Sequence, residues 1–362
     1  MNINPKYTAQ IAAILERAKS FVYYSQEGNL GDLLIAEATR QLFGDLNILY
    51  TEYKEEELPE HYTLVHSGGG RFIPYWCNID KAIKQLCNDN VTQCIILPSS
   101  FSNVDDLLKN FDERHTIFCR DPYSYEYCKS MCPKSTVFIA NDMGFYLRLI
   151  DLRPVPTTNA EAYCISEDEI STLNSIRNGL FEHLHEGIKR AIVKAPLGGR
   201  EKAIAFILRS DKEKGTKYKS EAAFDASIIW NTTGSHMMFN GNVLRQFSHA
   251  LKQADVIVSD RLHVCIMAYL SGREVYMIDN NYRKLSGVYE QTLKDDPRAH
   301  LLSDGILTPE LEAAWEQLQK EWEPYARRQK WKKALKSLKV ISIIIKIRRK
   351  IMAGLRKLCL FI

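Results

Sequence analysis

Short apolar runs alternate with helical patterns over the first 150 residues. The runs that predict buried strands are Ser20–Ser25, Thr63–His66, Cys94–Leu97, Thr116–Cys119 and Val137–Ala140. Between them, Asp32–Phe43 repeats Leu and Ala at helical spacing, and Ser124–Lys129 is predicted to be a further helix. Strands that alternate with helices favour a parallel sheet covered on both faces.

The same alternation returns after residue 200. Strands are predicted over Ala203–Leu208, Val256–Ser259 and Glu274–Ile278, and helices over Gly241–Gln253, Leu262–Leu270 and Lys284–Leu293. We therefore expect an α/β chain with two doubly wound domains. Two such domains would form a cleft between the carboxyl ends of their strands, where ligands bind.

The expected domains have boundaries set by changes in composition. Residues 1–155 form the first domain and 201–325 the second. The segment between them, 156–200, is predicted to be a connector that contains a helix over Ser166–Val193. Residues 326–362 form a separate C-terminal tail.

Charge is divided unevenly along the chain. Residues 326–362 contain 13 Lys and Arg and no acid, so 35 bases face 44 acids in residues 1–325, a balance of −9. An acidic body argues against a nucleic-acid enzyme, whose positive charge lies on the folded domain. The tail mixes its bases with Ile, Leu and Trp331, and we expect a partly amphipathic helix that binds an anionic membrane. A helix docked on the acidic body and a disordered tail are the alternatives.

The cysteines and the apolar runs bear on where in the cell the protein is expected to lie. The nine cysteines include no CxxC pair and no Cys/His cluster with zinc spacing. Reduced thiols in a cytosolic protein, with no metal site, are therefore expected. The N-terminus has no signal-peptide pattern, and no apolar run approaches the ~18 residues of a membrane span. We expect a cytoplasmic protein held peripherally on the inner face of the plasma membrane by its tail.

Glycines follow two predicted strands of the first half. Gly28-Asn29-Leu30-Gly31-Asp32 precedes the first helix, and Gly68-Gly69-Gly70 follows the second strand. Glycines allow a ligand to approach the backbone, and a helix N-terminus offers N–H groups to an anion. Taken alone, the first loop is better explained as a plain turn, whereas an approaching ligand and a tightly packed turn explain the second equally well. Neither loop is a GxGxxG or Walker motif, so dinucleotide and P-loop phosphate binding are not supported.

Basic residues follow three successive strands of the second half. Arg209 follows the first, Asp260-Arg261-Leu262-His263 the second, and Asn280-Asn281-Tyr282-Arg283-Lys284 the third. Bases gathered at one sheet edge predict a small anion with phosphate and carboxylate groups, because Arg binds both in bidentate fashion. An N-capping Asp260 with a surface Arg261 and a core His263 is the alternative.

Taken in order, the strand-end motifs resemble those of the polysaccharide pyruvyl transferase family from about Tyr23 to Glu290. Asp-Arg-Leu-His followed by Asn-x-Tyr-x-Lys is the most specific part of the match. The full set is Gly28-Asn29-Leu30-Gly31-Asp32, Gly68-Gly69-Gly70, Leu97-Pro98-Ser99, Arg120-Asp121, Ser124-Tyr125-Glu126, Asn141-Asp142-Met143, Asp260-Arg261-Leu262-His263 and Asn280-Asn281-Tyr282-Arg283-Lys284.

The resemblance implies a fold and an activity. The family has two Rossmann-like domains in a GT-B-like arrangement. Its members transfer the enolpyruvyl unit of phosphoenolpyruvate onto two sugar hydroxyls, which gives a cyclic pyruvate ketal and phosphate. Phosphoenolpyruvate is then a co-substrate, and no cofactor is implied. The acceptor would be a sugar of a surface or exopolysaccharide precursor, including one linked to polyprenyl diphosphate.

Roles for individual residues follow from this resemblance and from their chemistry. The residues expected to bind phosphoenolpyruvate are Arg209, Arg261, His263 and Lys284. We expect His263 to protonate the methylene carbon, with Asp260 adjusting its pKa or tautomer, and Asp32 or Asp142 to accept protons from the sugar. The residues expected to bind the acceptor are Gly28, Asn29, Asp32, Gly69, Gly70, Ser99 and Arg120.

Two other functions remain open on the sequence alone. A GT-B glycosyltransferase that uses a nucleotide sugar would share the fold, but would normally gather fewer bases in its second domain. A non-catalytic, membrane-bound scaffold of polysaccharide assembly would have no reason to gather cations at strand ends.

Overall fold

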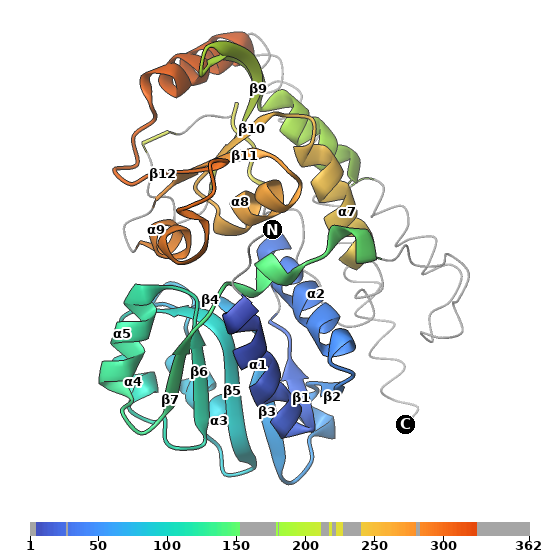
Figure 1. Cartoon of the computed structure of the whole chain (residues 1–362), viewed down its shortest axis with the longest axis vertical. Helices are drawn as coiled ribbons and strands as arrows, with labels where there is room; N and C mark the ends of the chain where they lie inside the picture. Colours follow the sequence, from blue (N-terminus) through green and yellow to red (C-terminus); the bar gives the residue numbers. More distant parts are fainter. Residues whose placement is uncertain are drawn as a thin grey trace, which may run out of the picture.

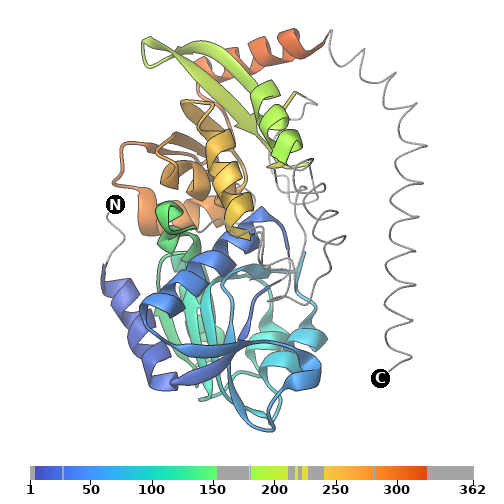
Figure 2. The same cartoon turned by 90° about the vertical axis from the view of Figure 1, so that its right-hand side faces the viewer.

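The computed structural model describes residues 5–26, 28–152, 179, 181–210, 217–218, 222–226, 240–279 and 283–323. These residues form an α/β fold with two sheets. Figures 1 and 2 place the second sheet beyond one edge of the first, with α2 (Leu30–Asp45) reaching from one to the other.

The first sheet is parallel throughout its described pairings. Its strand order is β2-β1-β3-β5-β6-β7, with β4 paired to β5. The strands are β1 (Ser20–Tyr24), β2 (Leu49–Glu52), β3 (Tyr62–His66), β4 (Gly69–Phe72), β5 (Val91–Phe101), β6 (His115–Cys119) and β7 (Thr136–Ile139). The other helices of this half are α1 (Pro5–Ala18), α3 (Ile79–Leu86), α4 (Asp105–Leu108) and α5 (Pro122–Met131), with short 3-10 turns that include η2 (Met143–Tyr146).

Alternating side chains cover both faces of this sheet, as predicted. Phe21 and Tyr23 pack into one hydrophobic cluster with α1 and α2, whereas the intervening Val22 packs into another with α3, α4 and α5. In β6, Phe118 joins the first cluster and Ile117 the second. Helices on both faces explain why these strands are almost continuously apolar.

Local capping sets where two site helices begin. The Asn29 side chain accepts a hydrogen bond from Gly31 N at 2.7 Å, and the Asp32 carboxylate accepts one from Asn29 N at 2.9 Å, which forms a capping box at α2. At α5, Asp121 accepts a hydrogen bond from Ser124 N at 2.8 Å, and Pro122 occupies the first helical position.

The second sheet has the order β12-β11-β10-β9-β8. The pairings from β9 to β12 are parallel, and β8 is an antiparallel edge strand. The strands are β8 (Ile192–Leu197), β9 (Arg200–Ile207), β10 (Val256–Ser259), β11 (Glu274–Ile278) and β12 (Ala299–Leu302). The helices are α7 (Asn240–Leu251), α8 (Leu262–Leu270), α9 (Lys284–Val288) with a following π-helix (Tyr289–Leu293), and segments over 181–190 and 309–323.

The helix predicted over Ser166–Val193 is wrong at its C-terminal end. Residues 181–190 are helical, but Ile192 and Val193 begin β8. β8 and β9 form a hairpin through Gly198 and Gly199, whose φ angles of 62° and 75° suit glycine. The remainder of the predicted helix, residues 166–178, lies outside the described residues.

The strand predicted over Cys94–Leu97 is longer than expected. β5 continues through Pro98 to Phe101, and its register with β6 shifts between Ile96 and Ser99. A register irregularity accommodates the proline, which has no N–H to give to a ladder. Elements with no counterpart among the predictions are α1, α3, α4, the helical segment 309–323 and the short strands β2, β4 and β12.

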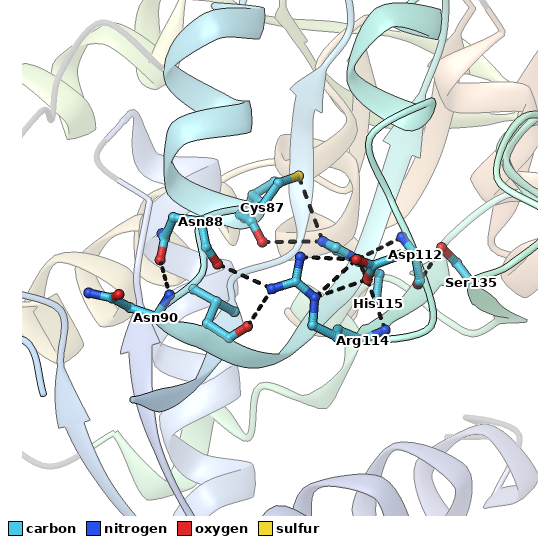
Figure 3. Close-up of polar contacts among 9 residues, drawn as sticks. Cys87, Asn88, Asn90, Asp112, Arg114, His115 and Ser135 are labelled. Carbon is cyan, nitrogen blue, oxygen red and sulfur yellow. Dashed lines mark hydrogen bonds and ion pairs between the residues drawn. The ribbon is translucent and has the colours of Figure 1, made fainter. Parts of the chain in front are cut away.

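Polar side chains close the amino-terminal edge of the first sheet, as Figure 3 shows. Arg114 donates to the carbonyl oxygen of Val91 at 3.0 Å and forms an ion pair with Asp112 at 2.9 Å. The buried His115 lies 2.9 Å from Asp112 Oδ1 through Nδ1. These bonds tie the starts of β5 and β6 together, away from the strand ends at which ligands bind.

A shared apolar core joins the two sheets. One hydrophobic cluster contains Leu34 and Ile35 of α2, Met143 of η2, Phe247 of α7 and Ile266 of α8. The first turns of α2 and α8 are thereby held against each other. Among the described residues, no helix is long and apolar enough to cross a membrane. The tail, residues 326–362, lies outside them.

Candidate functional site

The order in which successive strands are added to the sheet reverses between the parallel strands β1 and β3. β2 lies on one side of β1 and β3 on the other, so the loops after β1 and β3 leave the sheet in opposite directions. Open α/β sheets bind ligands at such a switch point, outside the carboxyl ends of the strands. The loop after β1 leads through Asn29 into α2, and the loop after β3 leads into Gly69 and Gly70.

His263, Asp142 and Arg120 meet across the two sheets. Arg120 Nη1 lies 2.6 Å from Asp142 Oδ2, and His263 Nε2 lies 3.4 Å from both atoms. Arg120 and Asp142 are fully buried, and His263 retains 15% of its side-chain exposure. Burial alone would raise the pKa of Asp142, but the nearby His263 and Arg120, with a hydrogen bond from Gly144 N, hold that pKa well below its usual range.

The start of α2 packs directly against the imidazole. A side-chain carbon added to Gly31 would lie 2.2 Å from His263 Nδ1, which is too close for any side chain. Gly31 therefore permits the first turn of α2 to touch the first turn of α8. This contact and the Asp142 carboxylate confine the imidazole from two sides.

Asp32 has a different environment from Asp142. It is partly exposed, and its Oδ2 accepts the hydrogen bond from Asn29 N. Burial raises the pKa of Asp32, and His263, the Asn29 N–H and Lys284 offset that rise only in part. A carbon added to Gly28 would lie 1.8 Å from Asp32 Oδ2, so glycine keeps space beside this carboxylate.

Two cations converge on Gly70. A carbon added to Gly70 would lie 2.9 Å from Lys284 Nζ and 3.1 Å from Arg120 Nη2, so these nitrogens are at most about 6 Å apart. Among the described residues, Arg120 Nη2 is buried without a hydrogen-bond partner. Two positive charges this close repel by about 3 kcal/mol at an effective dielectric constant of 20, before Asp32 and Asp142 offset them. The arrangement suits an additional anion.

A second polar group lies at the ends of β9 and β10. Arg261 Nε and Nη2 donate to the two oxygens of Asp225 at 2.6 and 2.8 Å, which forms a buried, bidentate pair. Asp260 Oδ1 accepts a hydrogen bond from Arg209 N at 2.8 Å, and its buried Oδ2 has no partner among the described residues. Burial raises the pKa of Asp260 to about 6, despite Arg209 and Arg261 nearby.

The four residues expected to bind phosphoenolpyruvate lie in two groups. His263 and Lys284 lie beside Asp32, whereas Arg209 and Arg261 lie around Asp260. The Arg261 guanidinium is buried and paired with Asp225, so it is not the surface residue of the alternative. Asn280, Asn281 and Tyr282 of the last motif lie outside the described residues.

Two expected positions differ in what they contact. Asp142, not Asp260, is the carboxylate beside His263 Nε2. Arg120, expected on the acceptor side, lies with His263 and Lys284. Both differences arise because the contact between the sheets brings first-half residues to second-half motifs, which sequence order cannot reveal.

Ser99, one of the residues expected to bind the sugar acceptor, forms a hydrogen bond within its own strand. Its hydroxyl donates to the carbonyl oxygen of Leu97 at 2.8 Å, whereas the neighbouring Ser100 accepts from Arg120 Nε at 2.9 Å. Gly69 has a φ of 131°, a conformation that favours glycine. The sequence analysis assigned no role to Gly31, Ser100 or Asp225. Gly31 lies inside a quoted motif and Ser100 directly follows one, but no motif signals Asp225.

The Cys87, His115 and Asp112 side chains in Figure 3 resemble a nucleophile, base and acid in order. However, His115 Nε2 lies 3.2 Å from the carbonyl oxygen of Leu86 and 3.8 Å from Cys87 Sγ. A carbonyl oxygen only accepts, so Nε2 carries a hydrogen and cannot take one from the thiol. Burial raises the pKa of Cys87 to about 11, so the sulfur stays protonated. This group is structural.

Within the described part of the chain, no cluster of His, Cys, Asp and Glu could hold a metal ion.

Comparisons with known proteins identify relatives of this chain. A crystal structure of a functionally uncharacterised protein from Klebsiella pneumoniae subsp. pneumoniae is similar, with a TM-score of 0.62 and 25% identity, over 84% of this chain and 99% of that one. A search of curated proteins gives no match. The family model described as polysaccharide pyruvyl transferase matches residues 29–282, from the capping residue of α2 to the motif that precedes Lys284. Because this match spans well over half of its length, the chain belongs to the polysaccharide pyruvyl transferase family.

Proposed function

We propose that this chain transfers the enolpyruvyl group of phosphoenolpyruvate onto two hydroxyls of a sugar in a surface or exopolysaccharide precursor. The product is a cyclic pyruvate ketal, and phosphate is released. Family membership supports pyruvyl transfer to a polysaccharide. The observation that supports this donor is the convergence of Arg120 Nη2 and Lys284 Nζ on Gly70, beside the His263 imidazole.

The donor carries a phosphate and a carboxylate, both of which need cationic partners. Arg120 Nη2 has no partner among the described residues, and Lys284 approaches the same point from the second half of the chain. We assign these two groups to one anionic end of phosphoenolpyruvate. Arg209 is the candidate for the other end, because it follows β9 beside the buried Asp260. Arg261 is assigned to holding this loop through Asp225.

The first chemical step needs an acid. His263 gives a proton to the methylene carbon, which becomes a methyl group and leaves an oxocarbenium-like centre at the adjacent carbon. Asp142 faces Nε2 and keeps its negative charge, because its pKa is low, so it stabilises the protonated imidazole. Gly31 fixes the ring from the Nδ1 side.

The sugar then attacks twice. The first hydroxyl adds to the central carbon and loses its proton to Asp32, whose raised pKa suits a base better than the low pKa of Asp142. Phosphate leaves, and the second hydroxyl closes the ring. Asp32 passes the first hydroxyl proton to the leaving phosphate, and the second hydroxyl proton restores His263, so both groups return to their starting protonation states.

The wider architecture is part of the proposal. The two sheets are assigned to two Rossmann-like domains, residues 1–155 on the acceptor side and 201–325 on the donor side, that face each other in a GT-B-like manner. Since β8 pairs with β9, the second unit begins before residue 201.

Residues 326–362 are assigned to an anionic membrane surface, at about 1 kcal/mol for each base near that surface. The protein would then lie on the inner face of the plasma membrane, near a lipid-linked acceptor. Liposome flotation with and without these residues tests this assignment. Equal flotation of both forms would exclude it.

The test of the chemistry is incubation with phosphoenolpyruvate and a panel of sugar acceptors. We expect phosphate release that depends on one acceptor, and a product heavier by one pyruvate ketal in mass spectrometry. His263→Ala should lower the rate by about 10²- to 10⁴-fold, as for loss of a general acid. The exposed His61→Ala is the control. Full turnover by His263→Ala would remove its assigned role, and no acceptor-dependent phosphate release would remove the proposed function.

A further inference from the structure

A contact between α5 and the segment after α9 lies beside the cation pair and has no role in the chemistry above. The Tyr123 hydroxyl donates to the Glu290 carboxylate, at 3.1 Å to Oε1 and 3.3 Å to Oε2. The Arg283 guanidinium lies over the Tyr123 ring, 5.2 Å from its centroid. We call Tyr123, Glu290 and Arg283 the clasp.

Hydrogen bonds fix the start of α5, the helix that carries Tyr123. Tyr123 is in the first turn of α5, two residues after the capping residue Asp121. Asp121 accepts hydrogen bonds from Ser124 N at 2.8 Å and from the Ser100 hydroxyl at 2.7 Å. The Ser100 hydroxyl also accepts a hydrogen bond from Arg120 Nε at 2.9 Å. The same hydrogen-bonded group therefore positions the start of α5 and the Arg120 guanidinium.

The opposite side of the clasp belongs to the segment that carries Lys284. Arg283 precedes Lys284 and has a φ of 58°, which is uncommon for a residue with a side chain. Such a conformation persists only where surrounding contacts hold it. Glu290 lies in the π-helix that follows α9, and π-helical turns are frequent at functional sites.

The two elements also touch between the clasp and the site. A carbon added to Gly287 would lie 2.7 Å from Asp121 Cβ and 3.3 Å from Tyr123 Cδ2, so α9 and α5 are in close contact. Further along, Thr292 Oγ1 lies 3.1 Å from Asn141 Oδ1. Gly287 lies between Lys284 and Glu290 in the sequence, so this contact holds the same short segment that carries both residues.

We propose that Tyr123 is a positioning residue that, through Glu290 and Arg283, holds α9 on α5 and thereby keeps the Lys284 ammonium beside Arg120. Tyr123 is assigned no contact with the donor or with the reacting atoms. This role rests on the proposed function for its catalytic consequence, but the mechanical part does not depend on it. The clasp is partly exposed, so its substitution should leave the fold intact.

The mechanical part is tested by hydrogen exchange in the full-length, ligand-free protein. Tyr123→Phe removes the hydroxyl but keeps the ring beneath Arg283, and Tyr123→Leu removes both. We expect faster amide exchange over residues 284–293 in Tyr123→Phe, and faster still in Tyr123→Leu. Tyr125→Phe, on the same helix, is the matched control and should match the wild type. Unchanged exchange over 284–293 in Tyr123→Leu would overturn the proposal.

The functional part is tested by kinetics with phosphoenolpyruvate. Loss of one hydrogen bond to a carboxylate should raise KM about threefold to tenfold in Tyr123→Phe, with kcat within about twofold. Because Tyr123 acts through Lys284, adding Tyr123→Phe to Lys284→Met should cause no further rise. A full additional rise in the double variant would overturn the proposal. If the wild type does not turn over phosphoenolpyruvate, the proposed function fails, and the exchange experiment alone decides on the clasp.

Discussion

Three aspartates at strand ends differ in their surroundings, and these differences separate their chemistry. Asp142 faces Arg120 and His263, which hold its pKa low. Burial raises the pKa of the partly exposed Asp32 and of the buried Asp260, because nearby cations and hydrogen bonds offset it only in part. Environments that push carboxyl pKa values apart distinguish a fixed anion from groups that exchange protons. Asp142 is therefore suited to orient the imidazole, and Asp32 to take a proton.

Replacement of Asp142 by Asn tests the fixed anion. The buried Arg120 charge would lose its partner, and we expect the free energy of unfolding to fall by about 3–5 kcal/mol at pH 7. A carboxyl whose pKa is lowered by folding stabilises above its unfolded pKa, so the wild-type advantage should decline below about pH 4. Urea denaturation at pH 7 and pH 3 measures both effects. A difference under 1 kcal/mol at pH 7 would contradict this account.

Asp260→Asn should give the opposite pH dependence. Folding raises the pKa of Asp260 to about 6, so the folded chain holds a proton that the unfolded chain has lost between about pH 4 and pH 6. Wild-type stability therefore includes a cost that grows as pH rises through this range. Asn does not titrate, so the variant should gain up to about 3 kcal/mol relative to the wild type between pH 4 and pH 7. If the difference in urea midpoint between wild type and variant stays constant over this range, folding does not raise the pKa of Asp260, and the account is contradicted.

At the scale of elements, the first turn of α2 determines how closely the two sheets approach. The capping box fixes where this helix begins, and its apolar face packs on α7 and α8. Gly31 faces the imidazole at this point, whereas Gly44, near the other end of the same helix, has no atom within 4 Å of the position of an added carbon. The two glycines of one helix thus have different reasons to lack a side chain.

Gly31→Ala and Gly44→Ala form a matched pair. Alanine favours a helix over glycine, so Gly44→Ala should stabilise the protein by about 0.5–1 kcal/mol without changing turnover. Gly31→Ala must displace the His263 ring, and a shift of about 1 Å should lower turnover by about 10²-fold. Thermal denaturation and phosphate release measure the two effects. Equal turnover in both variants would contradict the contact between α2 and His263.

At the scale of the molecule, the periodic apolar pattern was sufficient to predict much of the fold. The buried strands Val256–Ser259 and Glu274–Ile278 and the helix Leu262–Leu270 have the predicted bounds. Short, half-exposed strands such as Leu49–Glu52 lack a continuous apolar run and were missed. Edge strand β8, which follows a helix directly, was predicted as its continuation.

The site was less accessible from the sequence than the fold. Motifs identified the strand ends, because polar residues after parallel strands gather at one edge. They could not show that Arg120 meets His263, since residues 143 positions apart are joined only by the packing of α2 and η2 on α8. Asp225, which neutralises Arg261, lies in no recognisable motif.

The central claim is that cations from both halves of the chain bind one small donor that carries a phosphate and a carboxylate. Isothermal titration of the full-length protein with phosphoenolpyruvate, and with a panel of nucleotide sugars, tests it most directly. We expect phosphoenolpyruvate to bind and nucleotide sugars not to bind, and Lys284→Met to weaken binding by about 10- to 100-fold, as for loss of a charge-assisted hydrogen bond. The exposed Lys294→Met should bind like the wild type. Binding of a nucleotide sugar without binding of phosphoenolpyruvate, or unchanged affinity in Lys284→Met, would contradict the account.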